Sequence, residues 1–228
     1  MVLTGSDLVP GSGILKVLSE GLTLSIRDLI ELMMVLSDNT ATDLLTERVG
    51  LDNVNATLKQ LGLEKTTVVA DCRDILFDLV DLDDVPDGEK TLDLYNEMAG
   101  KSTRGATWSL GIEDNDVTTP NEMTKLLEMI VKGKAASRES CDAILETMQR
   151  CQTGGYRIPK YLPRGELTLA RKTGSLPGIR NDCAVITFRE SGETYILSCF
   201  TSEAKDVYAA EQTIADVSKY VYDYIVEK

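Results

Sequence analysis

The chain has 228 residues, of which 43% are hydrophobic and 27% are charged, and it carries a formal net charge of −13. These fractions are typical of a globular protein with a sizeable core, arranged as one domain or as two closely packed lobes. The acidic surface argues against nucleic acid or an anionic membrane as a partner, and no apolar run is long enough to span a bilayer.

Histidine is absent from the sequence, which excludes a Ser-His-Asp triad, a Cys-His dyad and any His-ligated zinc site. The five cysteines contain no Cys-x-x-Cys pair, so we predict no metal cluster and no other cofactor. Their odd number argues against a complete disulfide framework. Cys183 and Cys199 lie in apolar segments and are expected to be core thiols.

The first part of the chain has the apolar spacing of helices. A Pro-Gly-Ser-Gly turn begins a short helix within residues 9–20, and Ser25 with Asp28 forms a capping-box pair for the next helix. That next helix is apolar on most of its surface, which predicts a buried helix. Two more helices follow at residues 40–49 and 51–61, each ended by a glycine.

The middle of the chain is acidic and then rich in small polar residues. Residues 71–89 are expected to be part helix and part loop. A calcium loop counted from Asp81 would need glycine where Pro86 stands, so a solvated acidic face is the better interpretation. Residues 98–115, which include Trp108, are expected to form a long surface loop.

The remaining elements point to a mixed architecture. Pro120 begins a helix that ends at residue 131, and a second helix covers residues 137–151. Period-two alternation then predicts strands, and the last segment has the apolar stripe of a helix. The strands are expected at residues 166–172, 182–189 and 194–200, and the last helix at 206–226.

We therefore predict an α+β fold with two parts. Residues 1–160 would form a mostly helical lobe. Residues 161–228 would form a small antiparallel sheet of three strands with the C-terminal helix on one face.

Two short polar motifs interrupt the apolar segments. Ser37, Asp38 and Asn39 stand at the end of the second predicted helix, where a buried unpaired polar group would cost about 1–3 kcal/mol. By themselves they fit a corner between helices in which Asn39 or Thr40 caps the second helix. Lys-Thr-Gly at residues 172–174 fits, by itself, a charged strand end before a turn.

The two motifs together resemble a known family. Ser-Asp-Asn followed far downstream by Lys-Thr-Gly is the pairing of class A β-lactamases and penicillin-binding proteins. Residues 9–15 (Val-Pro-Gly-Ser-Gly-Ile-Leu) and 118–120 (Thr-Thr-Pro) resemble segments of the same family at matching places. The resemblance covers almost the whole chain and implies a β-lactamase-like fold and acyl transfer through a serine ester.

The resemblance implies proton transfer at the first motif. Ser37 would be catalytic and would relay a proton to the leaving nitrogen, because a hydroxyl can accept and donate hydrogen bonds at once. Asn39 would hold the substrate amide or a lysine. Asp38 would shape the turn and not touch the substrate.

The resemblance implies anion binding at the second motif. Lys172 would be catalytic and would, with the hydroxyls of Thr173 and Ser175, meet a substrate carboxylate. Gly174 would leave room for substrate along the strand edge. The backbone N–H of Ser175 would be an oxyanion donor, and Arg180 would add a carboxylate contact. We expect both motifs to converge on one pocket between the lobes.

Two departures from the family limit the expected activity. The family's Ser-x-x-Lys, which carries the nucleophile, is expected upstream of Val9, where only eight residues stand. Ser202 and Lys205 have the same spacing but follow the last strand, so we interpret that match as chance. No Glu-x-x-x-Asn stands in register before residue 118, and Glu97 and Glu113 are candidates for the deacylating base by proximity only.

Three hypotheses follow. The first is a β-lactamase-related serine hydrolase, acting on a β-lactam, a peptidoglycan-like substrate or a related amide, and inactive as this chain because the nucleophile segment is absent. The second is a catalytically dead carboxylate-binding module around Lys172 and Arg180, with a D-Ala-D-Ala peptidase-like acyl transferase as a further alternative. The third is a structural remnant without a site.

The predicted strand at residues 194–200 suggests a partner. It is rich in β-formers and has neither proline nor lysine to protect an edge. Because the resemblance places N-terminal strands beside it, we expect pairing with a missing N-terminal segment or with a second copy. Full-length members of the family are usually exported, but no signal peptide is visible here and the compartment stays open.

Overall fold

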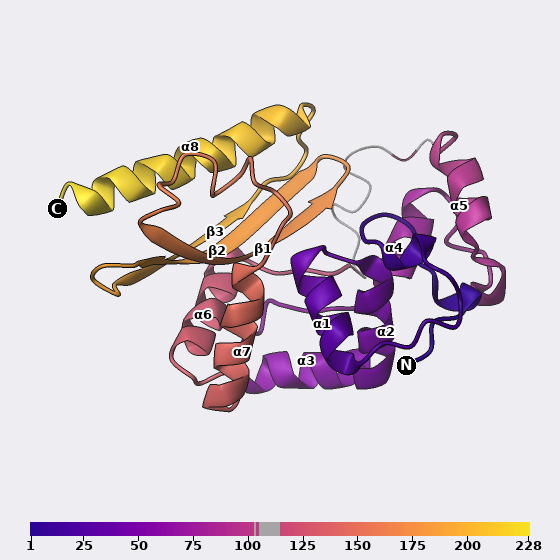
Figure 1. Ribbon diagram of the computed structural model, residues 1–228. Coiled ribbons are helices and arrows are strands. Elements are labelled where there is room, and N and C mark those ends of the chain that lie inside the picture. The colour runs from indigo at the N-terminus through magenta and orange to yellow at the C-terminus, as the bar shows by residue number, and fades with distance from the viewer. Residues whose placement is uncertain (103, 105–114) are drawn as a thin grey trace. The chain divides into compact units, whose positions relative to one another are not determined.

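The computed structural model of the protein describes residues 1–102, 104 and 115–228 (Figure 1). Trp108, Glu113 and most of the predicted surface loop lie outside these residues. The chain groups into two compact units, Met1–Val117 and Thr118–Lys228. The division at residue 160 remains a prediction about domains.

The first unit is helical, as the sequence predicts. Ser25 and Asp28 form the predicted capping box at the start of α1. The helix expected within residues 9–20 is only a 3₁₀ turn, and α5 was not predicted. The helices are α1 (Ile26–Val35), α2 (Asn39–Val49), α3 (Leu51–Gln60), α4 (Cys72–Leu79) and α5 (Leu92–Ala99), with 3₁₀ turns at Gly5–Asp7, Leu15–Val17 and Asp87–Glu89.

A small apolar core joins α1 and α2 to the N-terminal segment. Its buried members are Leu3, Leu15, Leu29, Ala41 and Leu44. The prediction that α1 is a buried helix needs correction, because Leu29 is its one fully buried residue and Ile30 is 39% exposed. The segment before α1 therefore contributes as much to this core as α1 does.

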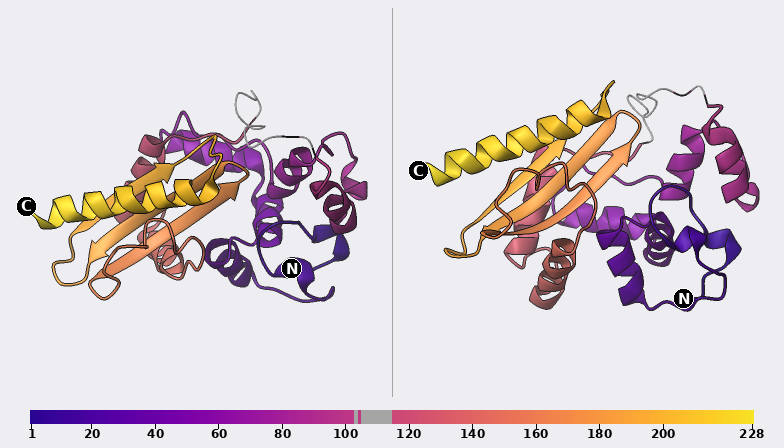
Figure 2. Two further views of the ribbon diagram at one scale, coloured as in Figure 1. Left: turned by 90° about the horizontal axis from the view of Figure 1, so that it is seen from above. Right: turned by 45° about the horizontal axis from the view of Figure 1, so that its top comes forward.

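The second unit confirms the α+β fold. Its three-stranded antiparallel sheet has the order β1-β2-β3. Helix α8 covers one face, and α6 and α7 cover the other (Figures 1 and 2). The elements are α6 (Pro120–Val131), α7 (Arg138–Gln149), β1 (Leu167–Leu176), β2 (Ile179–Phe188), β3 (Thr194–Phe200) and α8 (Val207–Val226).

The core of this unit lies between the sheet and α8. Its buried members are Ile158, Leu162, Leu167, Ala184, Ile186 and Ile214. Alternation along β1 puts Arg171, Thr173 and Ser175 on the α8 face and Lys172 on the opposite face. The hydrogen bond from Thr124 in α6 to Ser198 in β3 identifies the opposite face as the one that α6 covers.

The first strand is longer than predicted. It continues beyond Lys172 to Leu176 and turns into β2 through Pro177 and Gly178, and Gly178 has a φ of 70°. The Lys-Thr-Gly motif therefore lies within an edge strand of the described sheet and not after its end. All five cysteines are free, with Cys183 buried and Cys199 half-buried.

Candidate functional site

The Ser-Asp-Asn corner is organised by Asp38. Its side chain is 1% exposed and caps α2, with Oδ1 accepting from the N–H of Ala41 at 3.1 Å. Its Oδ2 accepts from the N–H groups of Ile14 and Leu15 at 2.6 and 2.9 Å. The cap is therefore Asp38, and the prediction of Asn39 or Thr40 was wrong because Asn39 is already inside the helix.

The Pro-Gly-Ser-Gly turn packs directly against this corner. Gly13 has a φ of 103°, and a Cβ there would lie 2.2 Å from Cγ of Asp38. Asn39 donates from Nδ2 to the carbonyl of Pro10 at 2.8 Å and from its backbone N–H to Ser12 at 3.2 Å. Only a residue without a side chain fits at Gly13, so the turn and the corner form one structure.

Ser37 is strained and accessible. Its φ of 56° lies in the left-handed region that non-glycine residues rarely adopt, and its side chain is half-buried. Strain of this kind clusters at functional sites, where the surrounding structure holds it in place. The neighbouring buried cap of Asp38 provides that support.

The Lys-Thr-Gly strand has a well-defined hydrogen-bond environment. Lys172 Nζ donates to the carbonyl of Thr173 at 2.7 Å. The buried hydroxyl of Thr173 lies 2.5 Å from the hydroxyl of Thr153. A Cβ at Gly174 would lie 3.8 Å from Cβ and Nδ2 of Asn181, an ordinary van der Waals contact, so a small side chain would fit there without a clash. Ser175 is exposed.

Arg157 is the residue that sequence reasoning missed. Its side chain is 5% exposed, and Nη2 donates to Ser175 Oγ at 2.6 Å. Nη1 donates to the carbonyls of Gly174 and Asn181 at 3.0 and 2.7 Å. Nε and Nη2 donate to Glu211 Oε1 at 3.2 and 3.1 Å. One guanidinium therefore joins β1, β2, the Ser175 hydroxyl and α8.

Arg180 holds the hairpin turn. Its Nη1 donates to the carbonyls of Leu176 and Ile179 at 2.8 and 2.7 Å, and Nε lies 3.5 Å from Glu211 Oε1. These contacts give Arg180 a structural role. Its predicted contact with a substrate carboxylate stays a prediction.

The neighbouring strand β2 carries a buried carboxylate opposite the Lys-Thr-Gly motif. Asp182 pairs with Thr173 in the β1–β2 register and is 0% exposed. Burial raises the pKa of its carboxyl to about 7, while the nearby Arg171 guanidinium acts in the opposite direction. The alternation of β2 predicts that this position faces the core, but an aspartate there gives no indication of its partner.

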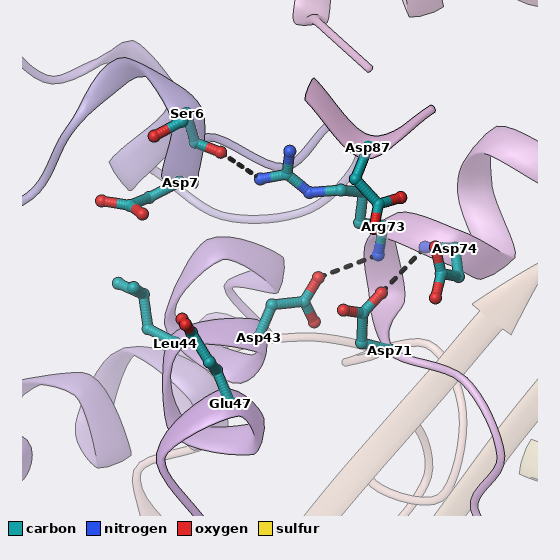
Figure 3. A pocket seen from close by; sticks show the side chains of 9 residues that line it. All are labelled: Ser6, Asp7, Asp43, Leu44, Glu47, Asp71, Arg73, Asp74 and Asp87. Atoms are coloured by element: carbon teal, nitrogen blue, oxygen red, sulfur yellow. Dashed lines mark hydrogen bonds between the residues drawn. The ribbon is translucent and has the colours of Figure 1, made fainter. Parts of the chain in front are cut away.

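The first unit also has an acidic pocket of about 310 Å³ (Figure 3). Asp43 accepts from the N–H groups of Cys72 and Arg73 at the start of α4, at 2.9 and 2.8 Å. Burial, followed by the nearby charge of Asp71, raises the pKa of Asp43 to about 6. Within the described residues no cluster of Cys, Asp and Glu has the arrangement of a metal site.

Three further positions were considered from the sequence, namely Glu97, Glu113 and Ser202. Glu97 pairs with Lys101 at 2.8 Å on the exposed surface of α5, and Glu113 lies outside the described residues. Ser202 is exposed in the loop after β3. Ser37 and Asn39 belong to the first unit and residues 172–175 to the second, so their convergence on one pocket stays a prediction.

Comparison with known proteins identifies the family. A sequence model described as the beta-lactamase enzyme family matches residues 1–225. This chain belongs to that family. The sequence-based recognition of the family is confirmed, whereas the roles of residues 37–39 and 172–174 stay predictions.

The individual relatives are β-lactamases. Beta-lactamase VEB-1 of Pseudomonas aeruginosa is 25% identical over 238 residues, covering 99% of this chain and 69% of the relative. Beta-lactamase BRO-1 of Moraxella catarrhalis is 23% identical over 233 residues, covering 99% and 64%. The crystal structure of a β-lactamase from Sphaerobacter thermophilus has a TM-score of 0.76 and 33% identity, covering 96% of this chain and 70% of that one.

The chain thus spans 69%, 64% and 70% of the lengths of these three relatives. In the described part of the chain no helix is long and apolar enough to cross a membrane.

Proposed function

We propose that these 228 residues supply the proton-relay and carboxylate-binding groups of a serine hydrolase that acts on a β-lactam or a related amide through an acyl-enzyme. Ser37 relays the proton and Asn39 holds the substrate amide. Lys172, Thr173 and Ser175 bind the substrate carboxylate. The proposal assigns to this chain roles that its β-lactamase family motifs support.

The observation that carries the proposal is the state of the Ser175 hydroxyl. Its oxygen accepts a hydrogen bond from the buried guanidinium of Arg157 at 2.6 Å. A hydroxyl has one donor and two acceptor sites, so its own hydrogen is left to donate elsewhere. Because the neighbouring cation polarises the O–H bond, this donor is suited to an anionic acceptor.

The open strand edge supports the same conclusion. In the described sheet β1 is an edge strand, hydrogen-bonded to β2 on one side only. An extended substrate amide can therefore pair with the backbone there, which brings its carboxylate to Ser175. Lys172 supplies positive charge from the same strand.

We further propose that these residues alone do not complete the reaction. The sequence contains a single Ser-x-x-Lys, at Ser202, and that serine lies exposed in a loop and not at a buried helix start. Acyl transfer needs an activated nucleophile. Ser37 as a relay and Lys172 as an anion contact do not replace one.

The test has two parts. The purified chain is mixed with a chromogenic cephalosporin and, separately, with benzylpenicillin, and is then analysed by intact-protein mass spectrometry. We expect no hydrolysis and no covalent adduct, but reversible binding of benzylpenicillin that its methyl ester does not reproduce. A stable adduct would overturn the assignment and direct attention to Ser202, and Ser202→Ala would then show whether that serine is the nucleophile.

A carboxylate-binding module without catalysis is the second candidate. The Arg157–Ser175 hydrogen bond favours it equally, because that contact concerns anion binding and not bond cleavage. The melting temperature measured with simple carboxylates distinguishes a binding module from a remnant without a site. A ligand that binds only the folded state raises the melting temperature. If neither acetate nor benzylpenicilloate raises the melting temperature, both the binding module and the hydrolase site are excluded.

A further inference from the structure

Residues 153–158 form a strap across the Lys-Thr-Gly end of the sheet. Thr153 contacts the Thr173 hydroxyl at 2.5 Å. Gly154 has a φ of 62°, and a Cβ there would lie 2.6 Å from Thr173 Cγ2. The strap therefore lies against the strand with no room for a side chain at its second residue.

The end of the strap is fixed from two sides. The N–H of Ile158 donates to Asp182 Oδ2 at 3.2 Å, and the carbonyl of Ile158 accepts from Ser218 in α8 at 3.0 Å. Ile158 itself is fully buried in the core. Arg157, which donates to the Ser175 hydroxyl, is the residue immediately before this anchor.

Burying the Asp182 carboxylate at this position costs free energy of desolvation. It is 0% exposed, and its charged neighbour is Arg171, with Nη1 3.6 Å from Oδ2. Replacing a buried ion pair by apolar residues of similar size is often neutral or stabilising. Stability is therefore a weak reason for this pair, whereas its carboxylate does accept the backbone N–H of Ile158.

We propose that Asp182 is a positioning residue of the site: its carboxylate, paired with Arg171, fixes Ile158 and so holds Arg157 against the Ser175 hydroxyl. Asp182 does not touch the substrate. It acts through the strap on the orientation of one hydroxyl. The consequence for ligands rests on the proposed function, whereas the consequence for Arg157 does not.

The charged and titratable groups around Asp182 come from every element packed on it. Arg171 and Lys172 belong to β1 and Arg157 to the strap, and all three favour the ionised carboxylate. Helix α8 contributes Glu211, which pairs with Arg157 at 3.1 Å. Cys199 of β3 stands opposite Asp182 in the register. Its thiol, like that of Cys183, has a raised pKa because it is buried, so both thiols stay neutral in the pH range of the test.

Protonation of Asp182 removes the charge that Arg171 pairs with. The pKa of about 7 puts this change between pH 6 and 8. If only the ionised form holds Arg157 in place, the fraction of competent protein changes by about tenfold over this interval, and ligand affinity changes by the same factor. Affinity for an anionic ligand is therefore expected to fall by up to about tenfold as the pH is lowered from 8 to 6.

The experiment uses the full chain labelled with ¹³C and ¹⁵N and the variant Asp182→Asn. The first readout is the Nε–H resonance of Arg157, which needs no ligand and is assigned by its loss in Arg157→Lys. The second is the affinity for benzylpenicillin and for its methyl ester at pH 8 and pH 6. Asp43→Asn is the matched control, because Asp43 is also buried and accepts two backbone N–H bonds but lies in the other unit.

We expect Asp182→Asn to shift or broaden the Arg157 resonance, to lower the affinity for benzylpenicillin at pH 8 by at least about tenfold, and to abolish the pH dependence. Asp43→Asn should leave all three unchanged. An unchanged Arg157 resonance and affinity in Asp182→Asn would overturn the proposal.

Two further outcomes separate this proposal from the proposed function. If the wild-type chain does not prefer benzylpenicillin to its ester, the proposed function fails, while the Arg157 resonance still tests the role of Asp182. If Asp182→Asn does not fold, the pH titration of the wild-type chain decides. The Arg157 resonance must then follow the same midpoint as the Asp182 carboxyl ¹³C resonance, and different midpoints would overturn the proposal.

Discussion

Replacing Asp38 by alanine should destabilise the first unit far more than the loss of an ordinary helix cap. Asp38 accepts three backbone N–H groups, from Ile14, Leu15 and Ala41, and is 1% exposed. Leaving the first two N–H groups without an acceptor costs about 1–3 kcal/mol each, and losing the cap costs about 1 kcal/mol more. We therefore expect a loss of roughly 3–7 kcal/mol.

Urea unfolding followed by circular dichroism measures this loss. Ser137→Ala is the matched control, because Ser137 caps α7 by accepting one backbone N–H, that of Ser140, and its hydroxyl donates to the exposed Ser140 hydroxyl. It should cost about 1 kcal/mol. Asp38→Asn keeps one acceptor oxygen and should fall between the two. If Asp38→Ala is no more costly than Ser137→Ala, Asp38 does not organise the corner and a direct role in the site must be reconsidered.

Three further results are expected. Gly154→Ala should lower the free energy of unfolding by about 2 kcal/mol or more, because Gly154 has a φ of 62° and a Cβ there would clash with Thr173. Gly155→Ala should lower it little, because a Cβ at Gly155 meets open space. Equal urea midpoints of the two variants would contradict this. The pKa of Asp43 is raised from 3.8 to about 6, so its contribution to the free energy of unfolding is present below about pH 4 and is lost as pH rises through 6. Asp43→Asn should reduce this pH-dependent loss by about 3 kcal/mol. An unchanged slope of unfolding free energy against pH would refute the shift. Size-exclusion chromatography with light scattering at micromolar concentration should show that the protein associates. We expect the edge of β3 and the exposed face of α8, which includes Tyr220 and Tyr224, to form the contact. A monomer would show that this edge is covered in another way.

The sequence predicted the elements with strong periodicity or clear punctuation. Thr119-Pro120 marks the start of α6 and Ser25 with Asp28 marks the start of α1, and both are as expected. The segment rich in β-formers that becomes β3 was predicted with its observed bounds. These patterns succeed because each depends on contacts within a few residues of the chain.

The misses depend on contacts that are distant in sequence. Asp38 becomes the cap because it also satisfies Ile14 and Leu15, more than twenty residues away. Strand β1 extends past the Lys-Thr-Gly motif because β2 pairs with it through Leu176, whereas the sequence predicted that the strand ends at residue 172.

The candidate site was predicted unevenly for the same reason. The motif residues carry a recognisable pattern, so their identity could be inferred before their surroundings were known. Arg157 and Asp182 have no local pattern, and their roles come from contacts 18 and 24 residues away with Ser175 and Ile158. Supporting residues of this kind become visible only when the fold is known.

The most direct test of the central claim is one titration of the ¹⁵N-labelled chain with benzylpenicillin. The account predicts that the side-chain amide of Asn39 and the backbone N–H of Ser175 both shift and fit a single dissociation constant, because in the proposed function both residues bind the same ligand. Shifts confined to one of these two residues, or two different dissociation constants, would contradict it.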